Sequence, residues 1–181
     1  MPSLTALGTA FTENFNSLAS TGTSSTLPSG WFFSESSSNT TYTAGTGSGN
    51  AGDTYSFGSA GSTERALGQL RSGSTISTIG ATFTNNTGAS ISSLQLSYTG
   101  EQWRLGAASR PTADQMNFQI SFDATSLTTG TWTDVDALDF VAPVTAGTVG
   151  ALDGNAAANQ RAVSSTLTLA NAIADGATFW I

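Results

Sequence analysis

The segment LQLSYTGEQWRLG, Leu94–Gly106, decides the fold class because apolar and polar side chains alternate along it. Leu94, Leu96 and Tyr98 fall on one face of an extended chain, and the residues between them are polar. This alternation with a period of two predicts a strand with one buried face, and it recurs along the sequence. The helical period is nearly absent, so the sequence predicts an all-β protein.

Similar alternation predicts the other strands and their connections. In MNFQISFDA, one face carries Met116, Phe118, Ile120 and Phe122. NNTGA is expected to join STISTIGATFT and SISSLQLSYT as a hairpin, and TSLTTG to join FQISFDA and TWTDVDAL. Further strands are predicted in FTENF, GWFFSES, RALGQL, AVSSTLTLA and GATFWI. LANAIADG is the best candidate for a helical turn.

Many short strands with turns between them predict a single β-sandwich domain over residues 1–181. We expect a two-sheet antiparallel sandwich of jelly-roll type. Residues 34–62 form a Ser/Gly/Thr-rich tract, either a long polar loop or an edge hairpin between YTAG and TYSFG. The printed sequence stops at Ile181 inside an apolar strand. The last strand of the sheet is therefore expected to be missing or supplied by another chain.

The composition limits the classes of partner and of chemistry. The net charge is -7, and the only basic residues are five scattered Arg, which argues against nucleic acid and against anionic membranes as partners. The absence of Cys and His excludes disulfides, thiolate metal sites and Ser-His-Asp catalysis. The sequence contains no apolar run long enough to span a membrane. An acidic, hydroxyl-rich surface is compatible with Ca²⁺ and with neutral glycans, and is typical of a bacterial extracellular protein.

Three segments together carry a resemblance to a known family: FTENFNSLASTG…LPSGW, SYTGEQWR and SFDATSLTTGTWTDVDALDF. They resemble a β-sandwich module found near the N-terminus of large secreted bacterial proteins of repeat-in-toxin, surface-anchored and extracellular-nuclease types. The resemblance covers essentially the whole chain. It implies a lectin-like jelly roll in a secreted protein, but it implies no particular activity, because the module occurs with many different partners.

The opening segment contains a conflict between its two halves. If the strand is regular, burial of Leu94 and Leu96 also buries Arg104 and exposes Trp103, and an unpaired buried charge costs several kcal/mol. A bulge at Gly100-Glu101 would shift the phase, turning Trp103 inward and Arg104 outward. On energetic grounds we favour the bulge, with Arg104 exposed and paired with a neighbouring carboxylate.

The alternative interpretation makes the same segment a binding site. Tyr98 or Trp103 would stack on the apolar face of a sugar, and Glu101 and Arg104 would bind its hydroxyls. The side that Trp103 faces therefore decides between a structural and a binding role.

Carboxylates are the candidate ligands for a Ca²⁺ ion, which binds six to eight oxygen atoms. Glu13, Asn14 and Asp153 are the proposed ligands. The alternative for each is that its side chain accepts a main-chain N–H in a turn, as Asp and Asn commonly do.

These observations favour a non-catalytic extracellular binding or adhesion module that recognises glycan or another cell-surface ligand. A second hypothesis is an assembly subunit whose sheet is completed by a strand from another chain. The least favoured is a glycoside hydrolase that uses Glu101 with Asp123 or Glu64.

Overall fold

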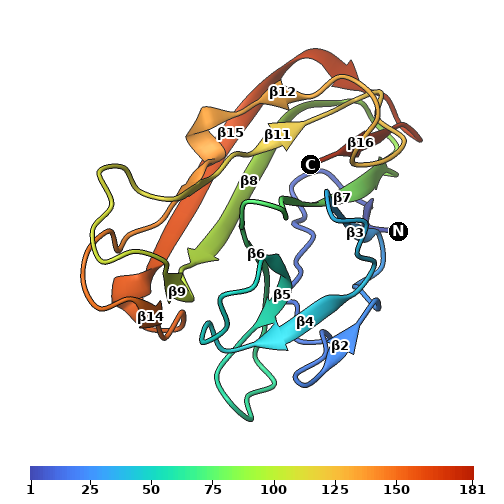
Figure 1. The fold of residues 1–181 in the computed structure, drawn as a ribbon. Coiled ribbons are helices and arrows are strands. Elements are labelled where there is room, and N and C mark those ends of the chain that lie inside the picture. Colours follow the sequence, from blue (N-terminus) through green and yellow to red (C-terminus); the bar gives the residue numbers. More distant parts are fainter.

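The computed structural model describes all residues, 1–181, with sixteen strands and two short 3₁₀ helices (Figure 1). The helices are η1 (Asp136–Leu138) and η2 (Ala157–Asn159). Neither is long and apolar enough to cross a membrane. The prediction of an all-β protein is confirmed.

The first sheet is built around one central strand. Its members are β7 (Ser77–Asn85), β3 (Trp31–Glu35), β16 (Thr178–Trp180) and β1 (Ser3–Leu4). The Ala81 N–H donates to the C=O of Ile181, and the next N–H, of Thr82, donates to Gly30. Adjacent N–H groups of a strand point to opposite sides, so β16 and β3 flank β7 on opposite sides. GWFFSES and GATFWI are thus confirmed as strands.

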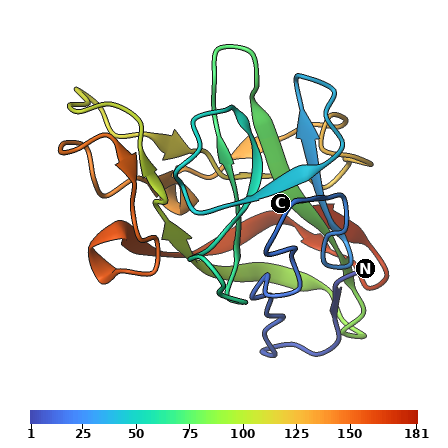
Figure 2. The same ribbon diagram turned by 60° about the horizontal axis from the view of Figure 1, so that its bottom comes forward.

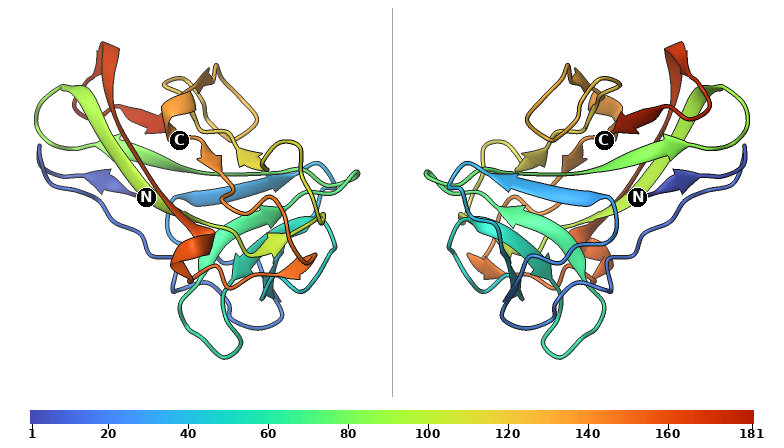
Figure 3. Two further views of the ribbon diagram at one scale, coloured as in Figure 1. Left: turned by 90° about the vertical axis from the view of Figure 1, so that its left-hand side faces the viewer. Right: turned by 90° about the vertical axis from the view of Figure 1, so that its right-hand side faces the viewer.

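The second sheet is the long antiparallel pair of β8 (Ile91–Glu101) and β15 (Gln160–Ile173). Figure 2 shows the two strands running side by side, and Figure 3 shows the pair along one side of the molecule. AVSSTLTLA is confirmed as part of β15. The pairing becomes irregular between Thr168 and Ile173.

The main core consists of apolar side chains from both sheets. Its buried members are Ala81, Phe83, Ile91, Leu94, Ile120, Ile173 and Phe179. Because β7 and β16 supply one side of this core and β8 and β15 supply the other, the β-sandwich is confirmed. The jelly-roll order of its strands stays a prediction.

A third sheet contains β2 (Thr23–Ser24), β4 (Tyr42–Gly45), β5 (Asp53–Phe57) and β6 (Ala66–Leu70). RALGQL is confirmed as a strand. YTAG and TYSFG do pair, as β4 and β5, but they run parallel, so an edge hairpin is wrong. The seven residues 46–52 carry the chain back along the short β4, which makes the parallel pairing possible. Together with the parallel pair β1–β7, this makes two of the sheets mixed rather than purely antiparallel.

Three short antiparallel pairs complete the fold. They are β9 (Arg104–Leu105) with β14 (Gly150–Ala151), β10 (Gln115–Met116) with β13 (Phe140–Val141), and β11 (Gln119–Ile120) with β12 (Thr133–Asp134). The β11–β12 pair confirms the connection predicted through TSLTTG. Along MNFQISFDA, however, Ile120 and Ser121 are both buried and Phe122 is 50% exposed. Ser121 exchanges both main-chain bonds with Trp180, which breaks the predicted alternation.

The predicted hairpin at NNTGA is wrong, because β7 and β8 belong to different sheets. Residues 86–90 instead form an arch that carries the chain from the first sheet to the second. The apolar faces of β7 and β8 both need burial, and the arch lets them face each other across the core. The fully buried Asn85 holds this arch. Its amide donates to the C=O groups of Ala89 at 2.8 Å and Ile173 at 2.9 Å, and its Oδ1 accepts from Thr87.

Two further predictions are wrong. FTENF is irregular because Glu13 and Asn14 bind the following main-chain N–H groups and Phe15 has a φ of 58°. LANAIADG contains the irregular end of β15 rather than a helical turn, and Ile173 still reaches Ile91 across the pair.

Candidate functional site

The ladder between β8 and β15 is regular along the first half of the opening segment. Gly100 lies opposite Arg161, and Glu101 lies opposite Gln160, with no shift in register. The predicted bulge at Gly100-Glu101 is therefore wrong. Gly100 is needed for a different reason, because the ring of Phe140 occupies the place of a Cβ atom there.

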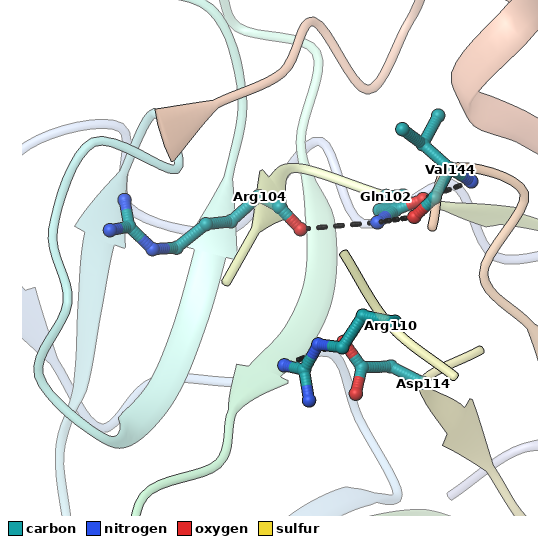
Figure 4. Close-up of polar contacts among 5 residues, drawn as sticks. All are labelled: Gln102, Arg104, Arg110, Asp114 and Val144. Atoms are coloured by element: carbon teal, nitrogen blue, oxygen red, sulfur yellow. Dashed lines mark hydrogen bonds and ion pairs between the residues drawn. The ribbon is translucent and has the colours of Figure 1, made fainter. Parts of the chain in front are cut away.

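The alternation of inward and outward side chains breaks two residues later, where the chain stops pairing with β15 and begins to pair with β14. Gln102 and Trp103 lie between β8 and β9 and are both buried. The Gln102 main-chain N–H still donates to the C=O of Asn159, and its side-chain amide adds two bonds to the main chain of Val144 (Figure 4). Its Nε2 donates to the Val144 C=O at 2.9 Å, and its Oε1 accepts the Val144 N–H at 2.8 Å. The side chain also donates to the C=O of Arg104.

Trp103 belongs to the core, with 4% of its surface exposed. Its ring is parallel to that of Phe57, with centroids 6.1 Å apart, and its Nε1 donates to Glu101 at 2.9 Å. Gly154 lies against the indole so closely that a Cβ atom would overlap it. The core position that we favoured is confirmed, so Trp103 presents no face to a sugar.

Glu101 and Arg104 also have structural partners. Burial raises the pKa of Glu101, and the nearby charges of Glu64 and Asp153 raise it further, while the hydrogen bond from Trp103 opposes the shift. Arg104 is half-buried, and its guanidinium donates to the C=O groups of Gly47 at 2.9 Å and Ser48 at 3.2 Å. The carboxylate partner that we expected for Arg104 is wrong.

Tyr98 is held in the same way. Its hydroxyl donates to the C=O of Leu138, and its ring stacks on Phe118 with centroids 6.3 Å apart. Burial raises the pKa of Tyr98 to about 12, and the charge of Asp139 adds to this increase. The four predicted binding residues are therefore close in the fold, but each is engaged in packing or in hydrogen bonds to other residues of the chain.

The candidate calcium ligands serve turns. Glu13 accepts the N–H of Phe15 at 2.8 Å, and Asn14 and Asp153 each accept an N–H two residues further on. No three carboxylate side chains converge on a point where they could hold a metal ion. The geometry favours the turn interpretation, and calcium binding stays a prediction.

A groove beside β3 was not predicted from the sequence. It has a volume of about 760 Å³ and lies between the segment that precedes β3 and the one that follows it. Phe32 is 42% exposed beside it and packs at a tilt against Trp180. The buried Nε1 of Trp31 has no hydrogen-bond partner. Three successive aromatic residues in GWFFSES were the available signal, but the segment was predicted only as a strand.

Two carboxylates meet at one end of this groove, and sequence reasoning also missed this pair. The Thr54 N–H is shared between Glu35, at 2.6 Å, and Asp53, at 2.9 Å. Burial raises the pKa of Glu35, but hydrogen bonds from Thr54 and Ser37 outweigh it and the pKa lies below its ordinary value. Burial raises the pKa of Asp53, and the charge of Glu35 adds to this. The two residues are 18 positions apart, so no local pattern marks them.

Comparison with protein families, with curated proteins and with solved structures finds no match for this chain. The fold and the site therefore define a class only: a β-sandwich protein with an open groove along one strand.

Proposed function

We propose that the protein is a non-catalytic binding or adhesion module of a secreted bacterial protein, recognising glycan or another ligand on a cell surface. The observation that carries the proposal is the groove beside β3. It is open, about 760 Å³ in volume, and lined by aromatic and hydroxyl side chains with Glu35 as the single ionisable group. Pockets that bind neutral ligands combine apolar surface with a few well-placed polar groups in this way.

Phe32 offers the test of this groove. We expect the purified chain to bind members of a glycan array, and Phe32→Ala to weaken this binding at least about tenfold, because exposed aromatic residues dominate such contacts. Phe122→Ala is the matched control, since Phe122 is 50% exposed, against 42% for Phe32, but lies outside the groove. Equal binding by both variants would remove the groove as the site.

Calcium enters the proposal as a stabilising ion bound through Glu13, Asn14 and Asp153. The oxygen atoms that accept the turn N–H groups would also have to face the ion. The expected result is a higher melting temperature in CaCl₂ than in EGTA, with MgCl₂ as the control for ionic strength. Identical melting in all three solutions would remove calcium from the proposal.

Assembly through strand addition is the second candidate function. Ile181 exchanges two main-chain bonds with Ala81, of 2.9 and 3.0 Å. Further along β7, Ile79 points its N–H and C=O to the same side and has no partner there, because β7 pairs only with β1, β3 and β16. A strand from another chain in line with β16 would take these bonds. Sedimentation across a range of concentrations tests this candidate, and a monomer throughout would count against assembly between copies.

A further inference from the structure

The free edge of β3 lies along the groove, and its main-chain groups have no strand partner. Ser36 donates to Ile76, and Thr82 donates to Gly30, so the even-numbered residues of this segment bond to β7. The main-chain N–H and C=O groups of the odd-numbered residues point away from β7. The C=O of Trp31, both groups of Phe33 and the N–H of Glu35 are left without a main-chain partner.

Two turns limit this free edge. The Trp31 N–H donates back to Pro28 at 3.0 Å, and the Glu35 C=O accepts from Ser38 at 3.2 Å. The four unpaired groups between these turns have the spacing of a β ladder, so three alternate residues of an extended peptide would satisfy all of them. A sugar has no such repeat.

The side chains of the groove specify the rest of the ligand. Phe32 is exposed on one face of β3, beside the position that a cross-strand neighbour would occupy, which favours an apolar residue there. Glu35 is the only charged residue that lines the groove, and Asp53 shares its donor. A basic residue at that end complements this charge. A second copy of the chain does not fit, since each copy carries a net charge of -7 and the edge offers no cation.

We infer that the β3 edge accepts an extended peptide as an added strand, with an apolar side chain beside Phe32 and a Lys or Arg at the Glu35 end. This inference rests on the proposed binding function and names the class of ligand for the same groove. Main-chain hydrogen bonds would supply affinity, and the two flanking side chains would supply selectivity.

The test uses fluorescent peptides with an alternating Thr–Val sequence, in which one Lys is moved along the chain. Fluorescence anisotropy is expected to show binding for one Lys position, and Lys→Asp is expected to abolish it. N-methylation of alternate amides, on the edge that faces β3, is expected to weaken binding at least about tenfold, because it removes two hydrogen bonds. N-methylation of the other alternate amides is the matched control.

Amide exchange measured by NMR provides a second readout that needs no variant of the protein. In the free chain the amides of Phe33 and Glu35 should exchange quickly and those of Phe32 and Ser34 slowly. The bound peptide should protect the first pair. Slow exchange at Phe33 and Glu35 in the free chain, or no binding by any peptide of the series, would overturn the inference.

The same measurements distinguish failure of the inference from failure of the proposed function. Binding of a glycan that leaves Phe33 and Glu35 unprotected would overturn strand addition and leave the proposed binding function standing. If neither glycans nor peptides bind, both proposals fail.

Discussion

Gln102 and Trp103 are adjacent in the chain, and both are buried although one is polar. A regular strand would turn one of them outward. Both can be buried because the chain is irregular here and the Gln102 amide bonds to the main chain of Val144. At the scale of single residues, the opening segment is therefore a packing unit that connects the long β8–β15 pair to the smaller third sheet.

Trp103→Ala should strongly destabilise the protein, because it leaves a cavity against Phe57. Large-to-small changes of buried aromatic residues cost about 3–5 kcal/mol of unfolding free energy. Urea denaturation measures this loss. Trp132→Ala is the control, since Trp132 is only partly buried. A smaller loss for Trp103 than for Trp132 would contradict its core role.

Gln102→Leu keeps most of the side-chain volume but leaves the N–H and C=O of Val144 without partners. Unpaired polar groups of this kind cost about 1–3 kcal/mol each. We expect a lower urea midpoint for this variant, with Gln95→Leu, at an exposed position of β8, as the control. Equal stability of the two variants would show that the amide bonds to Val144 are dispensable.

At the scale of elements, two connections determine how the strands meet. The arch between β7 and β8 moves the chain from one sheet to the other and is held by Asn85. The Glu35–Asp53 pair connects the end of β3 to the start of β5, and Ser77 of β7 also reaches Glu35. Both connections depend on buried polar groups, whose partners come from distant parts of the chain.

Asn85→Ala removes the donors to Ala89 and Ile173 and should lower the unfolding free energy by about 1–3 kcal/mol. Asn86→Ala, next in the chain, removes a hydrogen bond to Ser3 at the surface and should change stability by less than about 0.5 kcal/mol. Thermal unfolding of the two variants compares them directly. Similar melting temperatures would mean that the arch does not depend on Asn85.

The Glu35–Asp53 pair should make stability depend on pH. The raised pKa of Asp53 contributes stability that is present at low pH and is lost as pH rises through its folded value. The lowered pKa of Glu35 contributes stability that is lost as pH falls through its folded value. Together they predict greatest stability in the acidic range between the two folded pKa values.

Asp53→Asn tests this dependence, because the amide cannot ionise, so the decline in stability as pH rises through the raised pKa of Asp53 should disappear. Asp136→Asn, at an exposed position, is the control and should keep the decline of the parent protein. The measurement is the urea midpoint as a function of pH. An unchanged profile in Asp53→Asn would show that the pair does not titrate as a unit.

At the scale of the whole molecule, charge is sparse and unbalanced. The chain has twelve acidic residues and only five basic residues, all Arg. The single ion pair is Arg110–Asp114, at 3.1 Å and partly exposed (Figure 4). Self-repulsion of the acidic surface is therefore a destabilising contribution that few attractive pairs offset.

Salt should consequently raise the melting temperature, because it screens repulsion between exposed charges over a Debye length of about 10 Å at 0.1 M. Calorimetry in NaCl and in choline chloride distinguishes screening from binding of a particular cation. A melting temperature that falls with salt would contradict the dominance of repulsion.

The sequence by itself determined the all-β class and most of the strands, whereas the side that Trp103 faces was decided by the tertiary structure. Alternation of apolar residues is a local property, and burial of one face follows from it directly. The arch at Asn85, the parallel pairing of β4 and β5, the role of Gln102 and the meeting of Glu35 with Asp53 were decided only by the tertiary structure. Each depends on which strands become neighbours, and that choice is made by packing distant faces around a common core, which no local pattern encodes.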